Sequence, residues 1–62
     1  MVLTLKAARI NAGLTQKEAA AALGITKGTL ANYEMGKTVP KIDTAKKMVK
    51  LYGVSANHLD FF

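Results

Sequence analysis

Residues 15–36 read TQKEAAAALGITKGTLANYEMG, and this stretch decides the fold. Two of its threonines, Thr15 and Thr26, each stand directly before a segment suited to a helix. A threonine at that position can cap a helix, because its hydroxyl accepts a hydrogen bond from a backbone N–H group that the first turn leaves free. Glu18 follows Thr15 by three residues, which is the spacing of a capping box. The stretch therefore predicts two consecutive helices, one after each threonine.

The two predicted helices span residues 16–23 and 27–34. Only two residues separate the end of the first helix from Thr26, and a connection this short does not let the helices lie antiparallel. They must cross at a steep angle instead. Gly36 follows the second helix and can adopt the left-handed conformation that commonly ends one. The pattern is that of a helix-turn-helix.

Upstream of this pair, apolar residues recur with helical spacing. The spacing is i, i+4, i+7, i+11, at Leu3, Ala7, Ile10 and Leu14. We expect a helix over residues 5–12, with this apolar face turned toward the core.

Downstream, Pro40 interrupts the chain and predicts a loop over residues 37–40. A second apolar stripe then predicts a helix that ends at Gly53. The residues of this stripe are Ala45, Met48, Val49 and Tyr52. Ser55 can cap a last short helical turn that carries Leu59 and Phe62.

The sequence therefore predicts five short helices in a compact all-α bundle. No alternation of apolar and polar residues indicates a strand, so we expect no sheet. A chain of 62 residues without a linker or an internal repeat forms one domain, residues 1–62. A domain of this size has little room for the deep cleft of an enzyme.

The charge balance suggests a polyanionic partner. Nine lysine and arginine residues stand against four acidic ones, which gives a net charge of +5. The basic residues are spread along the chain, as on the surface of a folded domain. Such a surface favours nucleic acid, and less so an anionic membrane.

Several classes of protein are excluded by what the chain lacks. It has no cysteine, so it has neither a disulfide framework nor a thiolate metal site. His58 is the only histidine, and no pair of carboxylates suggests acid–base catalysis. We expect no catalytic residue, no bound metal and no cofactor. No apolar run is long enough to span a membrane or to act as a secretory signal, so we expect a soluble cytoplasmic protein.

The order of residues along almost the whole chain resembles the lambda-repressor/Cro-type (Xre-like) helix-turn-helix family. The residues that carry the resemblance are Gly13-Leu14-Thr15-Gln16, Ala20, Gly24, Ile25-Thr26, Leu30, Tyr33-Glu34, Gly36-Lys37, Pro40, Gly53-Val54-Ser55 and Leu59. The resemblance implies a sequence-specific regulator of transcription that binds double-stranded DNA. It further implies a phage or bacterial repressor that acts as a homodimer on a palindromic operator.

In this family the second helix of the motif enters the major groove and reads bases. The matching exposed positions are Lys27, Gly28, Thr29 and Asn32. Lys27 can donate to guanine, Asn32 can pair with adenine or a phosphate, and Thr29 can meet thymine or a phosphate. Gly28 departs from the long polar residue of other family members, so it adds no direct contact. It either allows a close backbone approach or is a tolerated weakness near the helix start.

The resemblance also implies contacts to the DNA phosphates. Gln16 matches the family's phosphate-contacting glutamine at the start of the first helix of the motif. The other candidates are Thr26, the backbone amides around Met35 and Gly36, and the side chains of Lys37 and Lys41. Lys46, Lys47 and Lys50 form a second basic face that we interpret as solvated.

Glu34 matches a buried glutamate that pairs with an arginine at the position of Arg9. We expect this ion pair to brace the two helices that carry these residues. Leu59, Phe61 and Phe62 concentrate apolar area where family members often form their dimer contact, so they are the candidate dimer interface. We expect one of the two phenylalanines to cap the core, and the other to be an interface residue or to cover a continuation of the chain, such as a further domain or protein partner at the C-terminus.

A different class of function stays open. The same fold can serve as an antitoxin or a protein-docking module whose basic surface binds an acidic partner. A peripheral membrane module is disfavoured, because no helix combines a wholly basic face with a broad apolar one.

Overall fold

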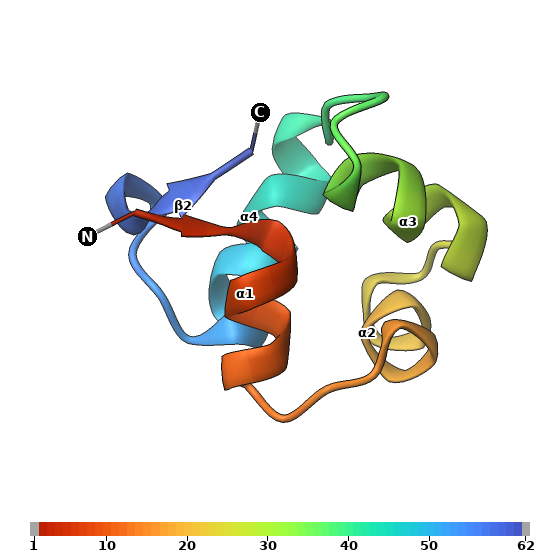
Figure 1. The fold of residues 1–62 in the computed structure, drawn as a ribbon, viewed down its shortest axis with the longest axis horizontal. Coiled ribbons are helices and arrows are strands. Elements are labelled where there is room, and N and C mark those ends of the chain that lie inside the picture. Colours follow the sequence, from red (N-terminus) through yellow and green to blue (C-terminus); the bar gives the residue numbers. More distant parts are fainter. Residues whose placement is uncertain (1, 62) are drawn as a thin grey trace.

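The computed structural model describes residues 2–61. In chain order the elements are β1 (Leu3–Thr4), α1 (Leu5–Asn11), α2 (Gln16–Leu23), α3 (Lys27–Glu34), α4 (Ile42–Tyr52), the 3-10 helix η1 (Ala56–His58) and β2 (Leu59–Asp60) (Figure 1). Within this part of the chain there are four α-helices, so the prediction of five was wrong. The helical bundle and the helix-turn-helix of α2 and α3 are as predicted.

Threonine caps begin both helices of the motif. Thr15 Oγ1 accepts from the backbone N–H of Glu18 at 3.1 Å, and Thr15 N–H donates to Glu18 Oε1 at 3.0 Å, which completes the capping box. Thr26 Oγ1 accepts from the backbone N–H of Thr29 at 3.1 Å. Gly24 ends α2 in the left-handed region, with φ of 72°. The bounds of α2 and α3 are those predicted, because local signals mark each end.

Helix α1 buries a different face from the predicted one. It ends at Asn11, and its buried residues are Leu5, Ala8 and Arg9. Ile10 is 55% exposed. The prediction set the phase of the helix from Leu3, which belongs to β1 instead. Arg9, the predicted partner of Glu34, lies on this buried face.

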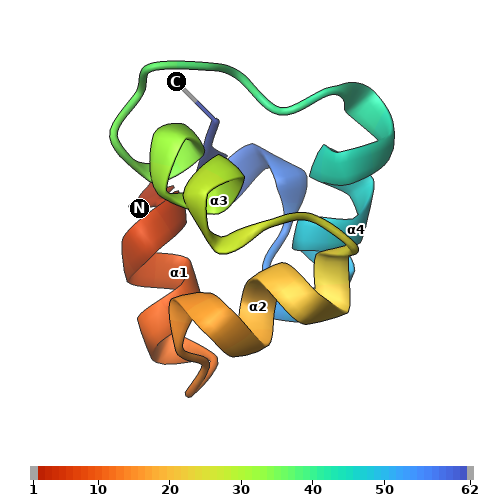
Figure 2. The same cartoon turned by 90° about the vertical axis from the view of Figure 1, so that its right-hand side faces the viewer.

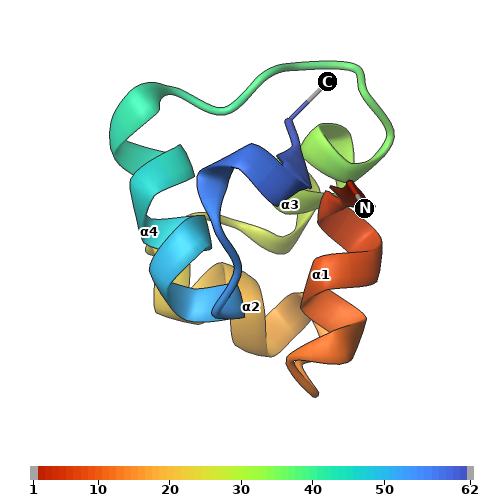
Figure 3. The same ribbon diagram turned by 90° about the vertical axis from the view of Figure 1, so that its left-hand side faces the viewer.

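The two ends of the described chain pair as a small parallel sheet (Figure 1), and they lie close together in the view of Figure 3. Leu3 lies opposite Leu59 and Thr4 opposite Asp60. The predictions of no sheet and of a fifth helix that carries Leu59 were therefore wrong. Ser55 does cap a short turn, but that turn is η1, and the chain is extended from Leu59. Strands of two residues are too short to leave a periodic pattern in a sequence.

The core lies where the four α-helices meet. Leu30 of α3 and Met48 of α4 are its largest fully buried side chains. Ala19 and Ala20 of α2 are also buried, and their small side chains let α2 pack close to α3 and α4. The remaining members are Leu5, Ala8, Leu23, Tyr52 and Leu59. Since α2 and α3 both contribute to this core, their crossing is fixed by packing.

Candidate nucleic-acid interface

The candidate interface consists of α3, the start of α2 and the segment after α3. Figure 2 shows α2 and α3 on the face turned to the viewer, with the connection from α3 to α4 running on the side of α3 that lies away from α2. Helix α3 turns Leu30 into the core and leaves Lys27 and Gly28 exposed. Thr29 and Asn32 are partly buried. The predicted base-reading residues thus come from one short, anchored helix.

Gly28 lies in open space. A Cβ atom added there would meet no other atom of the protein within 4 Å, and the backbone is not left-handed at this position. No close approach within the protein therefore requires glycine. The position is an unfilled site on the exposed surface of α3.

The two threonines at the start of α3 are linked to each other. Their Oγ1 atoms lie 2.8 Å apart, in addition to the cap that Thr26 makes with the backbone of Thr29. This hydrogen bond limits the rotation of both hydroxyls at the end of α3 that carries Lys27.

The backbone amides after α3 are already used within the protein. Met35 N–H donates to Ala31 O at 2.9 Å, and Gly36 N–H donates to Tyr33 O at 3.2 Å. Lys37 N–H donates to Asn32 O at 3.0 Å. Of the predicted phosphate contacts in this segment, the side chains of Lys37 and Lys41 are exposed and available as donors.

Arg9 and Glu34 form a buried ion pair between α1 and α3. Arg9 Nε lies 2.7 Å from Glu34 Oε2, and the two side chains are only 9% and 3% exposed. Arg9 Nη2 donates a longer bond to Glu34 Oε1 at 3.4 Å, and Arg9 Nη1 donates to the carbonyl of Leu14 at 2.8 Å. The pair fixes the end of α3 relative to α1 and to the connection that precedes α2.

The structure adds a third member to this pair. Gln16 Nε2 donates to Glu34 Oε1 at 2.9 Å, so α2 joins the network through its first residue. The sequence predicts the phosphate contact of Gln16 and the Arg9–Glu34 brace as separate features. No local pattern links residues 18 positions apart, and only the crossing of α2 over α3 brings them together.

Tyr52 of α4 places its hydroxyl near the same network. The side chain is buried, and among the described residues its oxygen has no hydrogen-bond partner. Burial raises the pKa of Tyr52, the negative charge of Glu34 raises it further, and Arg9 opposes the shift. The phenol is therefore neutral at physiological pH.

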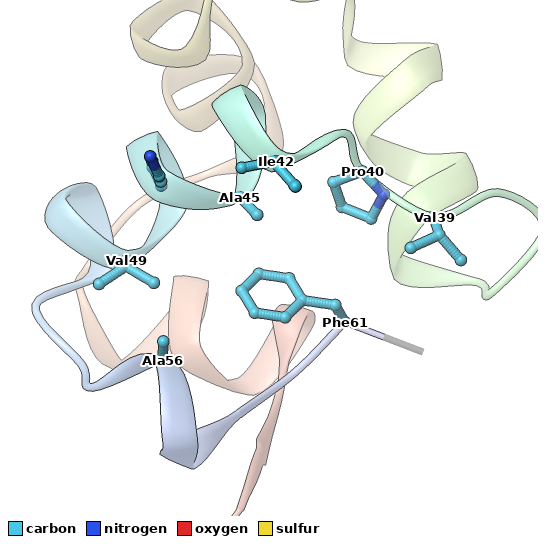
Figure 4. A pocket seen from close by; sticks show the side chains of 8 residues that line it. Val39, Pro40, Ile42, Ala45, Val49, Ala56 and Phe61 are labelled. Atoms are coloured by element: carbon cyan, nitrogen blue, oxygen red, sulfur yellow. The ribbon is translucent and has the colours of Figure 1, made fainter.

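The residues predicted to form a dimer interface differ in their burial and surroundings. Leu59 is only 5% exposed and pairs with Leu3 in the sheet, so it packs in the core of the domain. Phe61 is partly buried and lines an apolar pocket of about 410 Å³ between α4, η1 and the loop before α4 (Figure 4). The other lining residues are Val39, Pro40, Ile42, Ala45, Lys46, Val49 and Ala56. Phe62 lies outside the described residues.

Residues 2–61 contain no group of three or more histidine, cysteine, aspartate or glutamate side chains that could hold a metal ion. In the same range, no helix has the length and apolar character needed to cross a membrane.

Comparison with known proteins identifies the family. The helix-turn-helix family model matches residues 5–59, which include all four α-helices and the start of β2. The chain belongs to the helix-turn-helix family. Membership places it among the helix-turn-helix domains, a class of DNA-binding domain, as the sequence predicts.

Helix-turn-helix regulators are also its relatives among curated proteins. It is 49% identical over 55 residues to the HTH-type transcriptional regulator ImmR of Bacillus subtilis. The aligned residues make up 89% of this chain and 43% of ImmR. It is 41% identical over 46 residues to the cryptic phage CTXphi transcriptional repressor RstR of Vibrio cholerae. These residues make up 74% of this chain and 41% of RstR. The chain thus spans less than half the length of these relatives. No solved structure matches it.

Proposed function

We propose that this domain reads a specific sequence in double-stranded DNA by inserting α3 into the major groove. The observation that carries this proposal is the anchoring of α3. Leu30 fixes its buried side and Glu34 ties its end to α1 and α2, while Lys27 and Gly28 stay exposed in its first turn. A rigid helix with a free polar face suits the major groove, which is wide enough for one helix.

In this proposal the contacts divide into two kinds. Lys37, Lys41 and Gln16 bind phosphates and set the position of the domain on the duplex. Lys27, Thr29 and Asn32 read base edges. Because Gly28 offers no side chain, direct readout is modest, and the shape and deformability of the DNA supply part of the specificity.

We further propose that the domain acts in a repressor that binds its operator as a homodimer. The name of RstR states that it is a repressor. Exposed apolar side chains beside the pocket support a contact between copies: Val39 is 50% exposed and Ile42 74%. Two copies related by a two-fold axis would bind half-sites about 34–36 Å apart, one turn of DNA, and would exclude polymerase from the promoter.

Fluorescence anisotropy tests the proposal. An operator is first selected from a random pool of duplexes, and its affinity is compared with that of a scrambled duplex at several salt concentrations. We expect tighter binding to the operator by at least about 10³-fold. Equal affinity for both duplexes at every salt concentration contradicts the proposal.

A double variant separates DNA reading from the alternative role of a protein-docking module. Lys27→Ala with Asn32→Ala should abolish the preference for the operator while the circular dichroism spectrum stays that of the folded domain. If the domain is a docking module with no role in reading DNA, the wild type itself shows no preference for the operator over a scrambled duplex.

A further inference from the structure

The amide of Gln16 is held by a carboxylate before any DNA is present. Its Nε2 donates to Glu34 Oε1 at 2.9 Å, and Glu34 in turn accepts from Arg9 Nε at 2.7 Å. A carboxylate paired with an arginine only accepts hydrogen bonds, so Gln16 must present its NH₂ group to Glu34. One N–H of that group is used, and the second is left for another acceptor.

We propose that Glu34 is a positioning residue for DNA binding, which acts by holding Gln16 so that its second N–H meets a phosphate. This inference rests on the proposed function. A free glutamine side chain has many rotamers and loses that freedom when it contacts a phosphate. The bond to Glu34 removes much of that freedom in advance, so the phosphate contact costs less when it forms.

Arg9 makes this arrangement compatible with a polyanion. A carboxylate one side chain away from a phosphate would repel it if its charge were not balanced. Both oxygens of Glu34 accept from the guanidinium of Arg9, and the pair is largely withdrawn from solvent. The neutralised carboxylate can therefore orient Gln16 without opposing the DNA.

The same bond gives Glu34 a geometric role. Glu34 ends α3, the helix that reads bases, and Gln16 begins α2, the helix that crosses the phosphates. Their contact fixes the distance between a phosphate-binding group and the reading helix. The depth at which α3 enters the groove then depends on one hydrogen bond as well as on core packing.

A double-mutant cycle tests the role of Glu34. The affinity for a mixed-sequence duplex of about 20 base pairs, enough for two half-sites, is measured for the wild type, Glu34→Gln, Gln16→Ala and the double variant. All are compared at a temperature where circular dichroism shows them folded. We expect Glu34→Gln to weaken binding about fivefold in the wild type, because a neutral amide oxygen accepts from Gln16 more weakly than a carboxylate does and the new NH₂ group faces the Arg9 guanidinium. In the Gln16→Ala background the loss should be less than about twofold.

Glu18→Gln is the matched control. It removes one negative charge from α2, its carboxylate touches Thr15 and not Gln16, and glutamine can still complete a capping box. Its effect on affinity should be the same with and without Gln16. A purely structural role for Glu34 would behave like this control and give the same loss in both backgrounds, which overturns the inference.

Side-chain NMR of the wild-type protein gives a second readout that needs no variant to fold. One Nε2 proton of Gln16 should be shifted downfield and exchange slowly in the absence of DNA. Two protons that exchange at the rate of a free glutamine overturn the inference while leaving DNA binding intact. A wild-type protein that binds no duplex overturns the proposed function, and the inference with it.

Discussion

Arg9 Nε and Glu34 Oε2 lie 2.7 Å apart in the interior of the domain, and this ion pair joins α1 to the end of α3. An ion pair that is this well buried depends on both partners, because either one alone leaves a charge without compensation. Arg9→Met should therefore lower the free energy of unfolding by about 3–5 kcal/mol, as measured by urea denaturation.

The double variant Arg9→Met with Glu34→Leu is the control for this prediction. It removes both charges, so most of the lost stability should return. A double variant that is no more stable than Arg9→Met would show that packing of the arginine stem, and not the unpaired charge, causes the loss.

Gly28→Ala should stabilise the domain. The position is helical and open, and alanine is favoured over glycine in a helix by about 1 kcal/mol. Gly53→Ala is a matched comparison, because its Cβ would also meet nothing within 4 Å but its φ is +67°. That variant should lose stability, since alanine is strained in the left-handed region. The midpoint of thermal unfolding should rise in Gly28→Ala and fall in Gly53→Ala. A shift in the same direction in both variants would refute the prediction.

Tyr52→Phe should leave stability unchanged or raise it. The hydroxyl of Tyr52 is buried and has no hydrogen-bond partner among the described residues, so its removal relieves a desolvation cost of about 1–3 kcal/mol. The aromatic ring remains to fill the core. A clear loss of stability in urea denaturation would mean that the hydroxyl has a partner after all.

The same residue predicts a dependence on pH. The pKa of Tyr52 is raised above its ordinary value of 10.0, so the folded state favours the neutral phenol. This contribution to stability is fully present below pH 10.0 and is lost as the pH rises through the higher pKa of the folded state. Unfolding measured between pH 8 and 11, about two units below and one above that value, should show a steeper alkaline loss in the wild type than in Tyr52→Phe.

Lys37→Ala should reduce the salt dependence of DNA binding. Each phosphate that a lysine neutralises contributes about 0.9 to the slope of log affinity against log salt concentration. Because Lys37→Ala removes one such contact, the magnitude of the slope should fall by about 0.9. Lys50 lies in the last turn of α4, away from α3, and Lys50→Ala should leave the slope as it is. Equal slopes for Lys37→Ala and the wild type would remove Lys37 from the interface.

The sequence by itself determined the helix-turn-helix. Thr15, Glu18, Gly24 and Thr26 act through hydrogen bonds and backbone conformations within a few residues, so they mark the ends of α2 and α3 without any help from the rest of the chain. The positions that match the family predict which residues face DNA, and four of these positions, Lys27, Gly28, Thr29 and Asn32, belong to α3.

The tertiary structure alone decided the remainder, because it depends on contacts between distant residues. The sheet of Leu3 and Leu59 exists only because the fold brings both ends of the chain together, and it placed Leu59 in the core instead of at a dimer interface. The bond from Gln16 to Glu34 likewise depends on how α2 crosses α3. Caps can be predicted from neighbouring residues, whereas a buried polar network becomes visible only once the helices are packed.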